Sequence, residues 1–146
     1  MAAAGIELPP VVAPLASYIP ARRSGDLIWT SGQLPMVDGE LVASGKLGAG
    51  VSVVDGVHAA RVAALNAVAA AAHEAGGVDN ILRVLRVVVY VASHPDFVDQ
   101  PTVANGASEL LAEIFGKENG AHVRSAVGVS VLPLDAAVEV ELIVEV

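Results

Sequence analysis

Residues 120–146, GAHVRSAVGVSVLPLDAAVEVELIVEV, decide how this chain is expected to fold. Apolar residues alternate with polar or small residues through residues 122–131 and again through residues 137–146. This period of two predicts strands whose two faces differ. The sequence Leu-Pro-Leu-Asp at residues 132–135 predicts a bend between them. The stretch therefore predicts two strands of a β-sheet.

The first of these strands combines a cation with small side chains. One of its faces is mainly valine, and the other carries Arg124, Ala126, Gly128 and Ser130. Small residues beside a guanidinium predict open space that a small ligand or a second backbone could fill. In the second strand, the polar face carries Glu139, Glu141 and Glu145. We expect the chemistry of the protein at Arg124 and these carboxylates.

The composition predicts one domain that associates with copies of itself. A chain of 146 residues is large enough for a core of its own. Apolar residues make up 54% of it, mainly alanine and valine, and no apolar run reaches the roughly 18–20 residues of a membrane helix. Such a surplus of apolar surface predicts burial between subunits of a homo-oligomer.

Charge and residue usage disfavour several classes of function. A net charge of −8 argues against nucleic-acid binding, which needs clustered lysine and arginine. The chain has no cysteine, and its four histidines show no i, i+4 pair, so no metal site is predicted. His122 shares the face of Arg124 and is interpreted as a bystander. The first residues, MAAAGIELPP, lack the basic region of a signal peptide, which predicts a cytoplasmic protein.

The rest of the chain predicts alternating strands and helices. After an irregular arm at residues 1–15, a single domain is expected over residues 16–146. It is expected to contain strands at residues 17–22, 27–31 and 81–92, and helices at residues 52–75 and 101–115. This order predicts a two-layer α+β sandwich, a mixed sheet with both helices on one face. The other face is expected to be apolar and buried by oligomerisation.

The ends and faces of the first helix follow from particular residues. Ser52 is a good N-cap, and the pair Gly76–Gly77 allows a left-handed cap at the other end. A stripe through Val54, Val57, Leu65 and Val68 is predicted to face the sheet. Polar residues on the opposite side are predicted to be solvated: Asp55, His58, Asn66 and His73.

Several short motifs together resemble the Rid family (reactive intermediate deaminases, also called YjgF-like or L-PSP). They are Thr-Ser-Gly-Gln-Leu-Pro at residues 30–35, Asp96-Phe97, Asn105 followed by Glu109, Arg124-Ser125, Leu132-Pro133, and Val-Glu-Val-Glu at residues 138–141. Tyr18, placed in the first strand, also matches. The motifs stand in the family's order over residues 16–146.

The resemblance implies a chorismate-mutase-like fold and a homotrimer whose sheets form a central β-barrel. It implies ligand sites in clefts between subunits, where 2-imino or enamino acids are hydrolysed to 2-keto acids and ammonia without a cofactor. It also implies that the strand at residues 81–92 lies between the two final strands. In a direct hairpin, Glu139 would be roughly 15 Å along the strand from the position opposite Arg124.

The resemblance assigns roles to individual residues. Arg124 is implied to bind the substrate carboxylate and Glu139 to hold the attacking water, since arginine pairs with carboxylates through two hydrogen bonds and a glutamate can take a proton from water. From the residues alone, Arg124 could equally be a surface arginine paired with a glutamate. The other implied substrate-binding positions are Tyr18, Ser31, Gly32, Asn105 and Ala126.

Two departures from the family pattern lie beside the arginine. His122 and Val123 precede Arg124 where the family usually has a proline two residues before it, and Ala126 stands where cysteine is common. The sequence allows three functions: an imine deaminase, a non-catalytic trimer that binds a small carboxylate or keto acid, and an RNA-cleaving protein or translation inhibitor. The motifs favour the deaminase, and the acidic charge disfavours the third.

Overall fold

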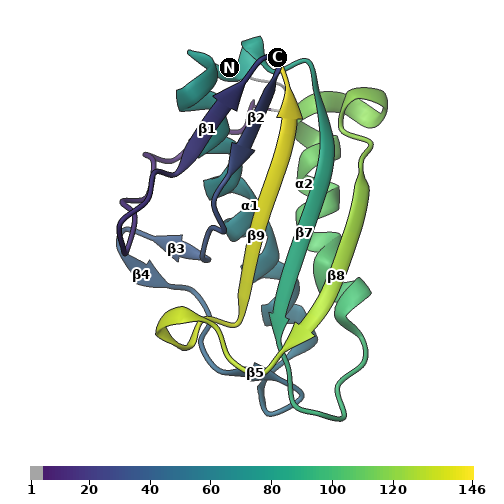
Figure 1. The fold of residues 1–146 in the computed structure, drawn as a ribbon. Coiled ribbons are helices and arrows are strands. Elements are labelled where there is room, and N and C mark those ends of the chain that lie inside the picture. The colour runs from purple at the N-terminus through teal and green to yellow at the C-terminus, as the bar shows by residue number, and fades with distance from the viewer. Residues whose placement is uncertain (1–4) are drawn as a thin grey trace.

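The computed structural model of the protein describes residues 5–146 as a five-stranded sheet covered on one face by two helices (Figure 1). The sheet contains β1 (Ala21–Ser24), β2 (Leu27–Thr30), β7 (Arg83–Ala92), β8 (Val123–Val129) and β9 (Val138–Glu145). The helices are α1 (Val53–Ala75) and α2 (Gln100–Asn119). Short strand pairs complete the fold: β3 (Met36–Val37) with β4 (Glu40–Leu41), and β5 (Lys46–Leu47) with β6 (Gly50–Val51).

The sheet is mixed, and its strand order is β1-β2-β9-β7-β8. β7 and β8 run parallel, whereas every other neighbouring pair is antiparallel. α2 makes the crossover that a parallel pair requires. β7 therefore lies between β8 and β9, as Figure 1 shows, and the direct hairpin between the last two strands does not form.

Helix α1 begins and ends where the sequence predicts. The hydroxyl of Ser52 accepts a hydrogen bond from the backbone N–H of Asp55 at 3.1 Å. At the other end Gly76 has φ 81°, a left-handed conformation that costs glycine little. A helix of this length and composition could cross a membrane, but the core helix of a folded domain meets the same criterion, and more than half of the apolar window of α1 is buried inside this fold.

The buried face of α1 is only partly the predicted one: Val68 of the predicted stripe is fully buried and Leu65 packs against the core. Val54 is 77% exposed, whereas most of the buried positions of the helix are alanines that belong to the core: Ala59, Ala60, Ala63, Ala64, Ala67, Ala70 and Ala71. Asn66, predicted to be solvated, is buried and donates hydrogen bonds to the carbonyls of Leu34 and Met36 at 3.0 and 2.9 Å. Small side chains let the backbones approach closely, so alanine rather than valine marks the packed face.

Helix α2 is longer than predicted because the chain resumes a helical turn after Gly116. Gly116 has φ 88°, which interrupts the helix where the sequence placed its end. α2 packs against α1 through Gly106, where an added Cβ would collide with the backbone carbonyl of Val57. The absence of a side chain at Gly106 thus sets how closely the two helices approach.

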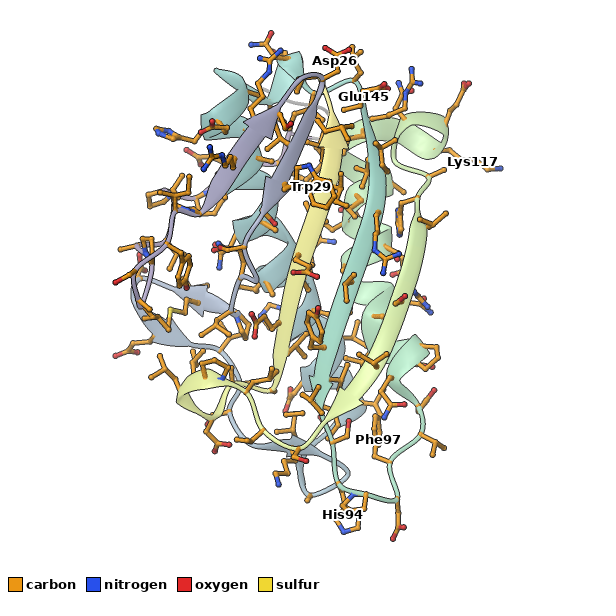
Figure 2. All side chains as sticks on the ribbon, in the orientation of Figure 1. Asp26, Trp29, His94, Phe97, Lys117 and Glu145 are labelled. Carbon is orange, nitrogen blue, oxygen red and sulfur yellow. The ribbon has the colours of Figure 1, made fainter. Side chains whose placement is uncertain are left out.

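The face of the sheet opposite the helices is less apolar than predicted. β7 is buried on its helix side, but its other side carries Arg86, which is exposed, and Tyr90, which donates a hydrogen bond to Glu141 at 2.8 Å. Trp29 is 50% exposed on this face, onto which Figure 2 looks. Register places Trp29 beside Ile143, and Ile143 beside Arg86. The face therefore mixes apolar and charged side chains.

The arm before the sheet is irregular in the part that the structure describes. Residues 6–20 contain no helix or strand, and Ile6, Leu8 and Val11 pack against the main core. Tyr18, predicted to lie in the first strand, precedes β1 and is 46% exposed. The division into an arm at residues 1–15 and a domain at residues 16–146 stays a prediction, and residues 1–4 lie outside the described part.

Candidate functional site

Backbone hydrogen bonds bring Gly32 against Glu139. The backbone N–H of Gln33 donates to the carbonyl of Val140 at 2.8 Å, and the N–H of Val140 donates to the carbonyl of Gln33 at 3.0 Å. This bridge extends the pairing of β9 beyond β2 and lays residues 31–33 beside Glu139. A Cβ at Gly32 would collide with the Glu139 carboxylate. Only glycine leaves room for this carboxylate in the position it occupies.

The environment of Glu139 favours its protonated form. Burial, which penalises a charged carboxylate, raises the pKa of Glu139 above its ordinary value, and the nearby charge of Glu141 raises it further. Glu141 in turn accepts the hydrogen bond from Tyr90. A carboxyl group with a raised pKa can exchange a proton with a reacting group closer to neutral pH than an ordinary glutamate can.

Tyr18 and Ser31 lie close to Gly32. All three residues line one recess beneath the arm, together with Pro20 and Leu34. The N–H of Ser31 donates to the carbonyl of Pro20 at 2.8 Å, and the hydroxyl of Ser31 accepts a hydrogen bond from Gln33 at 3.1 Å. We call Tyr18, Ser31, Gly32 and Glu139 the carboxylate half-site.

Arg124 lies elsewhere, in the seam between β8 and α2. Its Nη1 donates to Asn105 Oδ1 at 2.9 Å and to Ser108 Oγ at 3.1 Å, and its Nη2 donates to the carbonyl of Pro101 at 3.3 Å. All three acceptors are neutral. None of the ion pairs within residues 5–146 involves Arg124, so it is not the glutamate-paired surface arginine that the residues alone allowed.

The small residues beside Arg124 accommodate the helix rather than leaving open space. Ala126 packs against the main core. A Cβ at Gly128 would lie 2.8 Å from Gln100 Nε2 on α2. The predicted open space on this strand face is therefore filled in part by α2, and Ala126 lines the core side of the seam rather than a cavity.

His122 lies beside Arg124 and shares a hydrogen-bond partner with it. Its Nε2 lies 2.8 Å from Ser108 Oγ, and its Nδ1 lies 2.7 Å from the carbonyl oxygen of Gly120. Ser108 thus contacts both His122 and Arg124. We call Asn105, Ser108, His122 and Arg124 the arginine half-site.

The two half-sites lie on opposite faces of the sheet. Arg124 pairs in register with Val87, which belongs to the core beneath the helices, and its side chain contacts α2. Glu139 pairs with Tyr90 on the face away from the helices, between the buried Val138 and Val140. Arg124 and Glu139 of the same chain therefore cannot bind one small substrate together.

Comparison with known proteins assigns the fold and then the family. The sheet and helices match the chorismate-mutase-like architecture implied by the motifs, and a family model described as YjgF/chorismate mutase-like, putative endoribonuclease, matches residues 1–146. The chain therefore belongs to the YjgF/chorismate-mutase-like family. The predicted resemblance to Rid proteins and the predicted fold are confirmed.

Three relatives indicate how far the similarity extends. Protein TCP17 of Trypanosoma cruzi is 45% identical over 97% of this chain and 88% of its own length. The structure of a putative endoribonuclease from Shewanella oneidensis is 38% identical, with a TM-score of 0.93 over 98% of this chain and 94% of that chain. The structure of TdcF from Escherichia coli with bound serine is 26% identical, with a TM-score of 0.61 over 95% and 93%.

Ser108 belongs to the arginine half-site, although no pattern in the sequence selects it. It is one serine on a helix, fourteen positions before its histidine partner. Its place follows from the parallel pairing of β8 with β7, which lays β8 along α2. Asn105 and Arg124 were predicted and do lie together, as do Tyr18, Ser31, Gly32 and Glu139.

Proposed function

We propose that this protein hydrolyses 2-imino and enamino acids to 2-keto acids and ammonia, at a site completed by two copies of the chain. The observation that carries the proposal is the charge of Arg124, which is half-buried among neutral acceptors. Such a guanidinium favours an anionic partner, and a substrate carboxylate suits its planar donors. The relative TdcF holds serine, a small molecule with a carboxylate, which supports this ligand class.

Each half-site has a separate task in this reaction. Arg124 of one copy binds the carboxylate and orients the C=N bond. Glu139 of the neighbouring copy, in its ionised form, takes a proton from a water molecule whose oxygen attacks the imine carbon. That proton passes to the nitrogen and gives a carbinolamine. Glu139 then takes the proton of the new hydroxyl group and delivers it to the nitrogen, so that the C–N bond breaks as the C=O bond forms, and ammonia and the 2-keto acid leave. The raised pKa of Glu139 suits an acid–base group that must both accept and return a proton.

Two half-sites on opposite faces of one chain favour an oligomer in which they meet. A cyclic assembly brings different faces of neighbouring copies together, and a homotrimer is the assembly we propose. The exposed Trp29 and Val127 lie on the face that would be covered. No cofactor takes part in the proposed reaction.

A coupled assay tests the activity. An amino-acid oxidase generates the imine, and semicarbazide traps whatever survives. We expect the protein to speed the loss of imine, and Arg124→Ala to lower kcat/KM at least about a hundredfold. Arg61→Ala is the matched control, because Arg61 is a partly exposed arginine paired with Glu113 on the helix layer. A folded protein without effect on any imine would refute the proposal.

Subunit mixing tests the shared site. Arg124→Ala and Glu139→Ala are each expected to retain a measurable activity of at most about one per cent of the wild type. Co-refolded at equal amounts, they should regain about a quarter of the wild-type activity, since one site in four then receives both functional residues. No recovery in mixed oligomers would show that the residues do not meet between copies.

A non-catalytic regulator that binds a small carboxylate through Arg124 is the second candidate. The structure of TdcF favours it, because that structure contains bound serine and so demonstrates binding of a small carboxylate by a relative. Calorimetry with 2-keto acids separates the two: affinity that depends on Arg124, without imine turnover, would favour the regulator. RNA cleavage, named for the Shewanella relative, fits poorly with a net charge of −8.

A further inference from the structure

Ser108 occupies a position between a base and a cation. Its Oγ lies 2.8 Å from His122 Nε2 and 3.1 Å from Arg124 Nη1. All three side chains are partly exposed, at the seam where α2 meets β8. The proposed deamination uses Arg124 but gives no role to Ser108 or His122.

The second nitrogen of His122 fixes the direction of the hydrogen bond to Ser108. Nδ1 lies 2.7 Å from the carbonyl oxygen of Gly120, which can only accept, so Nδ1 carries the proton in the neutral ring. Nε2 is then the acceptor, and the Ser108 hydroxyl donates to it. A nucleophile bonded to a base, whose far side is held by a third group, is the arrangement that activates serine in hydrolases.

Arg124 supplies what a serine nucleophile also needs. When Oγ attacks a carbonyl carbon, negative charge develops on the carbonyl oxygen beside it. Nη1 of Arg124 lies 3.1 Å from Oγ, so the guanidinium is within reach of an oxygen on the carbon that Oγ attacks. The positive charge of the guanidinium strengthens this stabilisation.

We propose that Ser108, His122 and Arg124 form an esterase-like centre for small activated acyl compounds such as esters and thioesters. Ser108 Oγ forms a bond to the acyl carbon as its proton passes to His122 Nε2. The bond to the leaving group breaks, and that group takes the proton. Water then attacks the acyl carbon and gives a proton to His122 Nε2. Ser108 Oγ takes up that proton as its bond to the acyl carbon breaks, and the carboxylic acid leaves. The centre lies within one chain and does not depend on Glu139.

Covalent labelling tests the nucleophile. A fluorophosphonate probe, which modifies activated serines, is expected to add one label per chain, located at Ser108 by peptide mass analysis. Ser108→Ala should abolish labelling, whereas Ser130→Ala, which removes an exposed serine of the loop after β8, should not change it. A folded protein that takes no label at Ser108 would overturn the proposal.

The role of His122 distinguishes an activated serine from one that merely links a helix to a strand. His122→Ala is expected to slow labelling at least about a hundredfold, because the serine then loses its general base. His58→Ala, at an exposed position of α1, is the matched control. A labelling rate unchanged by His122→Ala would show that the hydrogen bond is only structural.

A second variant keeps the test valid if Ser108→Ala does not fold. Ser108→Cys should react with iodoacetamide at least about tenfold faster than Ser130→Cys, because only the first thiol has a base and a cation beside it. Equal rates would count against the centre. Wild-type hydrolysis of p-nitrophenyl acetate, lost on labelling, should accompany these results. None of these readouts uses an imine, so their failure leaves the deaminase proposal intact, and the reverse also holds.

Discussion

The carboxylate half-site is positioned by the backbone, and the arginine half-site is positioned by side chains. Near Glu139, the backbone hydrogen bonds between Gln33 and Val140 set the position of the loop. Near Arg124, the contacts are between side chains on α2 and β8, apart from one bond to the carbonyl of Pro101. Both half-sites rest on the same sheet.

This difference predicts how each half-site responds to change. Backbone placement tolerates few alterations, because moving the loop also breaks ladder bonds with β9. Side-chain placement changes in small steps, since each neutral hydrogen bond contributes only about 0.5–1.5 kcal/mol. Substitution of a residue that positions the carboxylate half-site should therefore cause a large loss of activity, whereas substitution of a residue that positions Arg124 should cause a small one.

The largest effect is expected from Asn66→Ala, which removes the support of the loop from the side of α1. The buried amide donates to the carbonyls of Leu34 and Met36, and its loss leaves buried carbonyl groups short of a partner. We expect a loss of about 2–3 kcal/mol in the free energy of unfolding, measured by urea denaturation.

Hydrogen exchange can show whether that loss is confined to one region. The amide of Gln33 should exchange faster in Asn66→Ala, whereas amides of β8 should change little. Asn80→Ala is the matched control, because the Asn80 amide makes one exposed bond to the carbonyl of Ala75. Equal destabilisation by the two variants would contradict the special role of Asn66.

Gly32→Ala is expected to impair the carboxylate half-site while sparing the fold. The new Cβ would displace the Glu139 carboxylate, a flexible group that can move. We predict a fall in deaminase kcat/KM of about ten- to a hundredfold, with little change in stability. In a Glu139→Ala background the same substitution should add nothing, and an additional loss there would show that Gly32 acts in another way.

Asn105→Ala should weaken the arginine half-site only moderately. Arg124 loses one acceptor and keeps Ser108 and the Pro101 carbonyl. We expect kcat/KM to fall about three- to tenfold, mainly through KM. Thr102→Ala, which removes the exposed bond between Thr102 and Asp99 on the same helix, is the control. A loss as large as that of Arg124→Ala would mean that Asn105 itself contacts the substrate.

The smallest effect concerns Glu139 and pH. Because burial raises its pKa in the folded state, the ionised carboxylate destabilises the fold, and this penalty is full above the folded pKa. It disappears as the pH falls below the ordinary value of about 4.3. Glu139→Gln should therefore be slightly more stable than the wild type near pH 7 and equal to it near pH 3.5.

Thermal unfolding at several pH values measures the difference in stability between Glu139→Gln and the wild type. Glu40→Gln, which changes an exposed glutamate of the β3–β4 hairpin, should show no such pH-dependent gain. A Glu139→Gln variant that is less stable than the wild type at neutral pH would show that the carboxylate makes a favourable contact there.

The sequence predicts the elements better than it predicts their faces. Alternation marks β8 and β9, and capping residues mark both ends of α1. The inner face of α1 was predicted only in part: Val68 is buried, but Val54 is exposed, because hydrophobicity selects valine and leucine whereas close packing also selects alanine. Asn66 was predicted to be solvated because it is polar. Its hydrogen-bond partners are backbone carbonyls, which no pattern of side chains reveals.

The residues of the site were predicted partly from the strand pattern and partly from the motifs. The strand pattern led to Arg124 and Glu139, and the family motifs added Asn105 and Gly32, but neither showed that Arg124 and Glu139 of one chain lie on opposite faces of the sheet. Those faces depend on β7 lying between β8 and β9, which is a long-range pairing. Ser108 and His122 come together for the same reason, so nothing local in the sequence indicates their contact.

The position of β9 in the sheet also affects how the chain reaches its fold. β9 pairs with both β2 and β7, and the backbone N–H of Leu142 donates to Thr30, 112 positions earlier. Until β9 forms, β2 and β7 each expose an unpaired edge, which can pair with another chain. Contacts so distant in sequence slow folding. We therefore expect the centre of this sheet to form late in folding, and the chain to be most prone to aggregate before that step.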